Sequence, residues 1–264
     1  MRRNLMLALA LAAVLSLGVV AVANAVQITL RAGNVVTTFG GSTSPKAMPK
    51  NKFTPVSTNV FGKIGTANGN HAPALREVEF DIDKDVKINV KGFPVCKAGQ
   101  LEARDTNAAM KVCGSTVLGK GESHVEIAFP EQKPLLVKSP LTVFNGGEKG
   151  GKVKLLIHIF ITVPVPAAVV TEVTISRKGT GIHSVAKIPV VAGGSGSAID
   201  FKFKLGKTYS YKGKKVGYFE AKCPDGVFKA DVKKLLFKNE AHTPGEGPST
   251  QEAGKLAVPC TSEH

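Results

Sequence analysis

The chain has 264 residues, with 35 Lys and Arg against 20 Asp and Glu, so its formal net charge is +15. Tryptophan is absent and aromatic residues make up only 6%, whereas sequence-specific binding of nucleic acid depends on aromatic stacking and on arginine's planar guanidinium. Arginine is also scarce, and beyond residue 25 it occurs at Arg31, Arg76, Arg104 and Arg177. The composition therefore excludes specific nucleic-acid recognition and favours a lysine-rich surface with a general attraction for polyanions.

Residues 1–25 predict a secretory signal peptide. Arg2 and Arg3 precede an apolar run from Leu5 to Ala23, and Ala23-Asn24-Ala25 has the small-x-small pattern of a signal-peptidase site. We expect a mature chain that starts at Val26 and is secreted or held at the cell surface, with no transmembrane segment after cleavage. The alternative is an uncleaved anchor, because the apolar run is near the long end for a signal.

Residues 26–71 predict a polar N-terminal extension. Two short β-type runs end at Thr38, and from Gly40 to Ala74 the chain consists mainly of Gly, Ser, Thr, Asn, Pro and Lys. A segment of that composition buries little apolar surface. We therefore expect a surface loop or linker before the main domain, which we place at residues 72–238.

The main domain begins with a clear alternating pattern. Six apolar residues fall on even positions and are interrupted by Lys84: Val78, Phe80, Ile82, Val86, Ile88 and Val90. This predicts either one strand that bends at Lys84 or two strands joined there in a hairpin. A short helix is expected next, capped by Asp105 or Thr106 and continuing through Val112.

The most apolar strand lies in the middle of the chain. One face of this strand carries only apolar residues: Val153, Leu155, Ile157, Ile159, Ile161 and Val163. The opposite face, which carries Leu156, His158 and Phe160, is about half apolar. Such a strand is covered on both sides. Pro164 and Pro166 end it, and a second β-branched run follows from Val169 to Ile175. A membrane helix is the alternative, but the uninterrupted apolar part is short and is split by the prolines.

The last part of the domain predicts more strands. In residues 199–205 apolar residues, among them Phe201 and Phe203, alternate with charged residues, among them Lys202 and Lys204, which predicts a half-buried strand. The runs 216–223 and 227–237 predict a hairpin across Pro224-Asp225-Gly226. Residues 239–264 are rich in Pro, Gly, Ser and Glu and predict a flexible tail, tied back through Cys260.

The chain contains four cysteines, Cys96, Cys113, Cys223 and Cys260. An even number in a secreted chain predicts two disulfides, and four cysteines allow three connectivities. We expect Cys96–Cys113 and Cys223–Cys260, because each pair lies within one local segment. No metal site is expected, since there is no C-x-x-C and no histidine at ligand spacing from a cysteine.

Two charged clusters are candidate binding sites. Glu77, Glu79, Asp81, Asp83 and Asp85 share a strand face, but the residues between them do not fit a calcium loop, so pairing with lysines across the sheet is favoured. Residues 200–238 are rich in lysine, which is typical either of polyanion binding or of exposed strands that resist aggregation. The candidate polyanion-binding residues are Lys202, Lys204, Lys207, Lys212, Lys214 and Lys215.

No catalytic motif is apparent. Gly193-Gly194-Ser195-Gly196-Ser197 misses the nucleophile elbow at its last glycine, and neither a phosphate loop nor a dinucleotide fingerprint is present, so no cofactor is expected. A hydrolase remains an alternative, which a cleft joining an acid, a histidine and a hydroxyl would support. A carrier of lipid or another apolar ligand is a further alternative, with Phe160, Phe201 and Phe203 lining a concave sheet.

The chain resembles uncharacterised secreted proteins of the actinobacterial kind. The resemblance is carried by the signal peptide, the Ala-, Val- and Gly-rich β sequence, and the cysteine contexts Gly92-Phe93-Pro94-Val95-Cys96, Cys113 and Cys223-Pro224-Asp225-Gly226. The resemblance implies a secreted, disulfide-bonded β protein and no known activity. We therefore expect an all-β fold, an antiparallel β-sandwich or partly open barrel with at most one short helix. The expected function is non-catalytic binding at the cell envelope, to anionic cell-wall polymer, polysaccharide or lipid headgroups.

Overall fold

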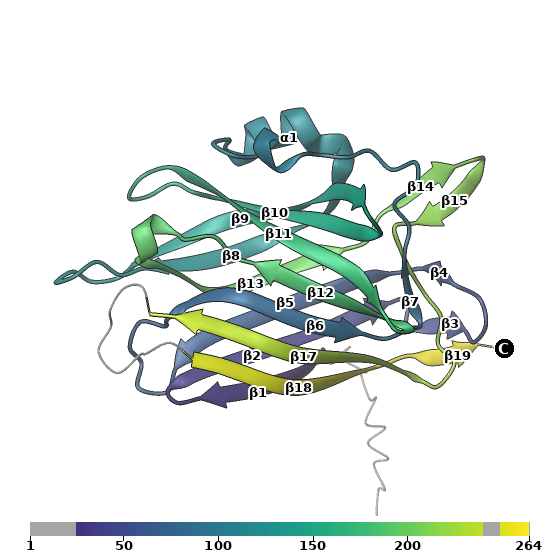
Figure 1. Cartoon of the computed structure of the whole chain (residues 1–264), viewed down its shortest axis with the longest axis horizontal. Coiled ribbons are helices and arrows are strands. Elements are labelled where there is room, and N and C mark those ends of the chain that lie inside the picture. Colours follow the sequence, from purple (N-terminus) through teal and green to yellow (C-terminus); the bar gives the residue numbers. More distant parts are fainter. Residues whose placement is uncertain (1–24, 240–248, 264) are drawn as a thin grey trace, which may run out of the picture.

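The protein is built around one antiparallel sheet of twelve strands (Figure 1). The computed structural model describes residues 25–239 and 249–263, so all but the last residue of the predicted signal peptide lies outside it. In spatial order the strands are β1 (Val26–Ala32), β2 (Val35–Ser44), β5 (Ser57–Thr66), β13 (Gly196–Leu205), β8 (Val117–Ile127), β9 (Leu135–Lys149), β10 (Lys152–Ile161), β11 (Ala167–Lys178), β12 (Gly181–Lys187), β6 (Ala74–Ile82), β17 (Val227–Lys238) and β18 (Ser249–Pro259).

The sheet curls until its two edge strands meet. A Cβ placed on Gly254 of β18 would lie 2.3 Å from the Cδ1 atom of Ile28 on β1, so the two edges pack against each other. This packing shields the two edges, and exposed sheet edges otherwise template aggregation. The result is a nearly closed barrel, and it confirms the predicted all-β fold in its partly open barrel form.

Apolar side chains fill the barrel. Leu155, Ile157 and Ile159 of β10 point inward together with Val153, as their alternation predicts, and they pack with Leu141, Val143 and Val173 of the neighbouring strands. The rings of Phe201 and Phe203 on β13 also lie in the interior, with centroids 5.8 Å apart. Burial of this continuous apolar surface is the main force that stabilises the fold.

The outer face of the central strands is covered by the segment between Cys96 and Cys113. This segment contains η1 (Ala98–Gln100) and the helix α1 (Thr106–Cys113), and η2 (Gly114–Thr116) follows directly after it. Asp105 caps α1 by accepting a hydrogen bond from the Ala108 N–H at 2.8 Å, so the predicted helix is confirmed. The segment packs on Phe144 and Leu156, which explains why β10 is apolar on both faces.

His158 lies beneath the same segment and is fully buried. Its Nε2 atom is 2.9 Å from the carbonyl oxygen of Arg104, and burial lowers the pKa of the imidazole. A neutral ring that donates from Nε2 fits this environment. His158 is therefore a core histidine that fastens the covering segment to the sheet.

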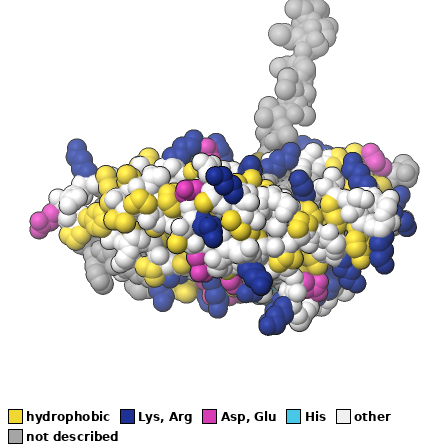
Figure 2. Space-filling model, turned by 90° about the horizontal axis from the view of Figure 1, so that it is seen from above, with side chains coloured by type: hydrophobic (Ala, Val, Ile, Leu, Met, Phe, Trp, Pro, Cys, Tyr) yellow, Lys and Arg dark blue, Asp and Glu magenta, His cyan; other side chains and the backbone are white. Residues whose placement is uncertain are grey.

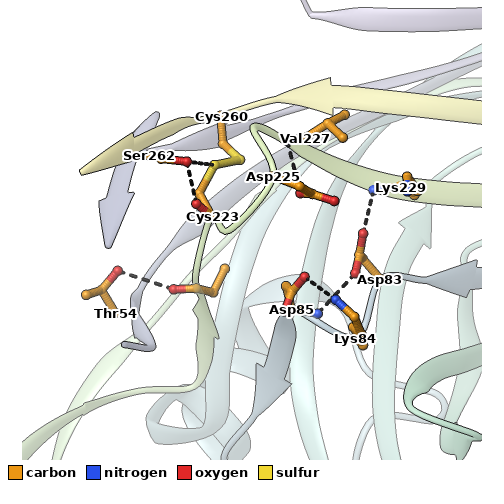
Figure 3. Close-up of a disulfide and its surroundings, with 11 residues drawn as sticks. Thr54, Asp83, Lys84, Asp85, Cys223, Asp225, Val227, Lys229, Cys260 and Ser262 are labelled. Carbon is orange, nitrogen blue, oxygen red and sulfur yellow. Dashed lines mark hydrogen bonds and ion pairs between the residues drawn. A yellow bond between two sulfur atoms is a disulfide. The ribbon is translucent and has the colours of Figure 1, made fainter. Parts of the chain in front are cut away.

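Three small sheets extend the barrel at one end: β4 (Thr54–Pro55), β16 (Phe219–Ala221) and β7 (Val86–Ile88); β14 (Thr208–Tyr211) and β15 (Lys214–Gly217); and the parallel pair β19 (Thr261–Glu263) and β3 (Ala47–Pro49). The Cys223–Cys260 disulfide lies among them (Figure 3). Ser262 donates a hydrogen bond to the Cys223 carbonyl at 2.6 Å. Both predicted disulfide pairings are confirmed, and the C-terminal segment is tied back through Cys260.

Three expectations about the elements are wrong. Residues 26–71 are not a linker, because β1, β2 and β5 belong to the main sheet. Their glycines serve close packing: a Cβ on Gly62 would lie 2.6 Å from the Phe201 ring. The predicted hairpin across residues 224–226 does not form, since β17 pairs with β6 and β18 instead. Residues 249–259, predicted as part of a flexible tail, form the edge strand β18.

Candidate polyanion-binding site

The strand β13 places two of the candidate lysines on the outside of the barrel. Phe201 and Phe203 point into the core, and the alternation of an extended chain turns Lys202 and Lys204 to solvent, where both are exposed. The strand lies between β5 and β8. Its lysines therefore face residues of two neighbouring strands.

Lys202 is neutralised by an acid on β8. Its Nζ atom lies 2.7 Å from Oε1 of Glu122, and Lys138 of β9 lies 2.6 Å from the other oxygen of the same carboxylate. Hydrogen bonds from Lys138 and then Lys202 lower the pKa of Glu122 to about 2. Lys202 therefore belongs to an internal ion-pair triad, and of the six predicted lysines it contributes least free charge.

The Glu122 triad predicts a pH-dependent contribution to stability. Since the pKa of Glu122 falls from 4.5 to about 2 on folding, the ion pairs stabilise the fold above pH 4.5 and are lost as the pH falls towards 2. We expect NMR titration of the Glu122 side chain to give a pKa near 2. The variant Lys138→Gln is expected to raise it towards 4.5, while a value near 4.5 in the wild-type protein would contradict the pairing.

Lys204 has a different environment. In the β13–β8 register it lies directly opposite Lys120, and on β5 it lies opposite Asn59. Within the described part of the chain no acid forms an ion pair with Lys204 or Lys120. Like charges placed directly opposite each other in a sheet destabilise the pair. The strand register thus places two exposed lysines, neither of them in an ion pair with a described acid, directly opposite each other.

The remaining candidate lysines follow in the chain at the same end of the barrel. Lys207 connects β13 to β14, and Lys212, Lys214 and Lys215 lie at or beside the tip of the β14–β15 hairpin, which projects from the barrel (Figure 1). In the described ranges none of these four pairs with an acid. The Lys212 ammonium lies 5.7 Å from the Tyr211 ring centroid.

Backbone contacts hold this hairpin in place. The Tyr209 hydroxyl lies 3.2 Å from the Asn89 carbonyl oxygen and 2.9 Å from that of Lys91, so it can donate to either. A Cβ on Gly92 would lie 2.2 Å from the Tyr211 ring, so only glycine fits there. We use the name lysine cluster for Lys120, Lys204, Lys207, Lys212, Lys214 and Lys215. Lys120 was not among the sequence candidates, because only the pairing of β8 with β13 brings it beside Lys204.

The acidic row divides into two parts, neither of which converges on a common point. Glu77, Glu79 and Asp81 lie on the outer face of β6. They pair with Lys233 and Lys234 of β17, His183 of β12 and Lys178 at the end of β11. This confirms the pairing across the sheet. Among the described residues no group of three or more His, Cys, Asp and Glu side chains could hold a metal ion.

Asp83 and Asp85 lie in the turn between β6 and β7 (Figure 3). Asp83 accepts a hydrogen bond from the backbone N–H of Lys229 at 3.2 Å. Asp85 is buried, and its oxygens lie 2.9 Å from Lys84 and 3.3 Å from Lys222. Burial raises the pKa of Asp85, but the two ammonium groups outweigh it and hold the pKa below its ordinary value. Both carboxylates therefore have structural roles.

An acid, a histidine and a hydroxyl do meet at the other end of the barrel. The Nδ1 atom of His71 lies 2.6 Å from Glu126 Oε1, and its Nε2 atom lies 3.3 Å from Ser197 Oγ. However, Ser197 is buried, with 2% of its surface exposed, and its hydroxyl donates to the Ala72 carbonyl at 2.7 Å. A nucleophile needs access to its substrate and a proton directed at its base. The arrangement instead fastens the segment before β6 to β13 and β8.

The interior holds side chains where a carrier would hold its ligand. The two most marked hollows on the described structure are open to solvent, with volumes of about 260 and 300 Å³. One is lined mainly by charged residues, including Asp81, Asp83 and Asp231, and the other by Pro49, Lys50, Asn51, Lys52 and Glu263. Ligand sites for apolar molecules are enclosed and mostly apolar. These hollows therefore do not support the carrier alternative.

No protein-family model matches the chain, and no curated protein or solved structure is significantly similar to it. In the ranges that the structure describes, none of the helical segments has the length and apolar character needed to cross a membrane.

Proposed function

We propose that this protein is a non-catalytic binding module of the cell exterior, and that its lysine cluster holds an anionic polymer such as an acidic cell-wall polysaccharide. The observation that carries the proposal is the direct pairing of Lys120 with Lys204 in adjacent strands. The acids nearest to them on the same face, Glu122 and Asp200, pair with Lys138, Lys202 and His124 instead.

The charge arrangement favours an extended ligand. The cluster begins on the outer face of the sheet at Lys120 and Lys204 and continues along the chain through Lys207 to the projecting hairpin. A row of flexible ammonium groups suits a polymer that carries repeated negative charges, whereas bidentate recognition of a single phosphate depends on arginine. Binding of this type weakens steeply with salt.

The location outside the cell is part of the same proposal. Two disulfides are typical of proteins that fold in an oxidising compartment. Mass spectrometry of protein from the host's medium or cell surface tests this directly. A mass that starts at Val26 with both disulfides formed supports it, and a protein found reduced inside the cell contradicts it.

The variant Lys204→Glu tests the binding site, because it is expected to move stability and binding in opposite directions. The introduced carboxylate would face Lys120 across the strands and turn a repulsion into an attraction, so the free energy of unfolding should rise by about 0.5 kcal/mol. Affinity for dextran sulfate at low salt should fall several-fold, since the cluster loses a cation and gains an anion. Thermal unfolding and isothermal titration with dextran sulfate measure the two effects.

The control is Lys111→Glu, which makes the same charge change at an exposed position in the last turn of α1. A negative charge near a helix C-terminus slightly lowers stability, and binding should stay close to wild type. If Lys111→Glu weakens binding as much as Lys204→Glu, only the net charge matters and the lysine cluster is not a site. Uncharged dextran serves as the ligand control.

A further inference from the structure

The exposed hydrophobic residues of the protein are not spread evenly. Seven large hydrophobic side chains are exposed among the described residues, and five lie in or beside three connections at one end of the barrel: Leu135, Leu136, Val163, Val165 and Val190. Val165 and Leu136 are 70% and 62% exposed. We call these five residues the apolar end. Figure 2 shows hydrophobic side chains gathered at the left end of the molecule, the end at which the β8–β9 hairpin projects in Figure 1.

The strand register brings these connections together. Leu135 of β9 pairs with Ile127 of β8, which in turn pairs with Gly196 of β13, while β10 lies on the other side of β9 and runs towards the same end. Beneath the connections lies one buried cluster, Val125, Ile127, Val137, Ile161, Val169 and Val191. The three connections therefore all start from this buried cluster, which holds their tips at the same end of the barrel.

The chemistry of the tips suits a bilayer interface. From Ile159 to Thr171 the chain carries no charged residue, and prolines occur at Pro164 and Pro166 in the β10–β11 turn and at Pro130 and Pro134 in the β8–β9 connection. Proline has no backbone N–H, so each one removes a donor that would need a partner away from water. These loops can therefore enter the region below the headgroups at lower cost than ordinary polar loops.

Basic residues flank the same end. Lys133, Lys138 and Lys187 are exposed beside the three connections, and Glu131 is the one acid within those connections. Lys138 shares the Glu122 carboxylate with Lys202. An apolar tip with lysines around it complements anionic lipid, since the side chains insert while the ammonium groups contact the headgroups.

The shape favours lipid over a second copy of the chain. A stable protein interface buries about 800 Å² per partner on a complementary surface, whereas here the β8–β9 hairpin and the β10–β11 turn project separately (Figure 1). A bilayer deforms around separate tips. We propose that the apolar end inserts into the outer layer of an anionic membrane, independently of the lysine cluster at the other end of the barrel.

The test is partitioning into vesicles of phosphatidylcholine with about one-third phosphatidylglycerol, against vesicles of phosphatidylcholine alone. The protein is used as recovered from its host, with the same N-terminus in every variant. The wild type is expected to bind the anionic vesicles. The double variant Val163→Asp, Val165→Asp is expected to lower the partition coefficient about tenfold or more, because it places charges at the inserting tip.

Matched controls separate this site from others. Val95→Asp with Val112→Asp changes the two exposed valines of the covering segment, which are 53% and 44% exposed, and should leave partitioning unchanged. Lys204→Glu, in the lysine cluster, separates the two surfaces: loss of vesicle binding in that variant, with the Val163→Asp, Val165→Asp variant at the wild-type level, would assign the binding to the lysine cluster and overturn the proposal. Absence of wild-type binding would overturn it too. Light scattering that shows a dimer abolished by Val163→Asp, Val165→Asp would overturn it in favour of a second copy.

Discussion

Replacement of both Cys223 and Cys260 by alanine is expected to lower the free energy of unfolding by about 4 kcal/mol. The bridge joins residues separated by 37 positions, and in the chain-entropy model a loop of that size contributes about 4 kcal/mol by restricting the unfolded chain. It also anchors the end of β18, the strand that packs against β1. Its removal therefore has two effects: it loosens the contact between β18 and β1 in the folded protein, and it gives the unfolded chain more conformational freedom.

Urea unfolding followed by circular dichroism and tyrosine fluorescence measures this effect. The comparison is the double variant Cys96→Ala, Cys113→Ala, whose bridge spans 17 positions and should contribute about 3 kcal/mol. That bridge holds a segment on the outside of the barrel, so the sheet should keep its unfolding cooperativity without it. A loss below about 1 kcal/mol for the Cys223 and Cys260 pair would contradict the assigned role.

Replacement of Asn145 by alanine is expected to cost about 3 kcal/mol or more, because the fully buried side chain makes three hydrogen bonds. Its Nδ2 atom donates to the Pro94 carbonyl at 2.7 Å, and its Oδ1 atom accepts from the Gly147 N–H at 3.0 Å and from the Tyr218 hydroxyl at 2.8 Å. Alanine leaves these groups without partners. Asn145 thus joins three parts of the chain at the edge of the core.

The variant Tyr218→Phe provides the matched comparison. Tyr218 is fully buried, and burial raises the pKa of its hydroxyl, which therefore stays protonated and donates to Asn145. Phenylalanine removes one of the three bonds and should cost about 1 kcal/mol. The double variant should cost less than the sum of the two, since both single changes remove the same bond. If Asn145→Ala costs no more than Tyr218→Phe, the contacts to Pro94 and Gly147 contribute nothing.

The candidate site was only partly predictable from the sequence. The alternation of Phe201 and Phe203 with lysines placed Lys202 and Lys204 on the solvent side, because the period of a strand is local. Their different environments were not predictable. Lys202 meets Glu122 and Lys204 meets Lys120 because β13 pairs with β8 in one register, and a shifted register would give both lysines other partners.

Four features could be predicted from the amino-acid sequence: the all-β class, the helix after Asp105, the doubly covered central strand and the two disulfides. Each of these depends on local periodicity, on capping or on the spacing of cysteines. Two features depend on how distant strands pair: residues 26–71 and 249–259 complete the barrel, and most of the exposed valines and leucines gather at one end. Closure brings β1 into contact with β18, although the two strands lie near opposite ends of the sequence. Contacts between strands so far apart in the sequence leave no periodic signal in it.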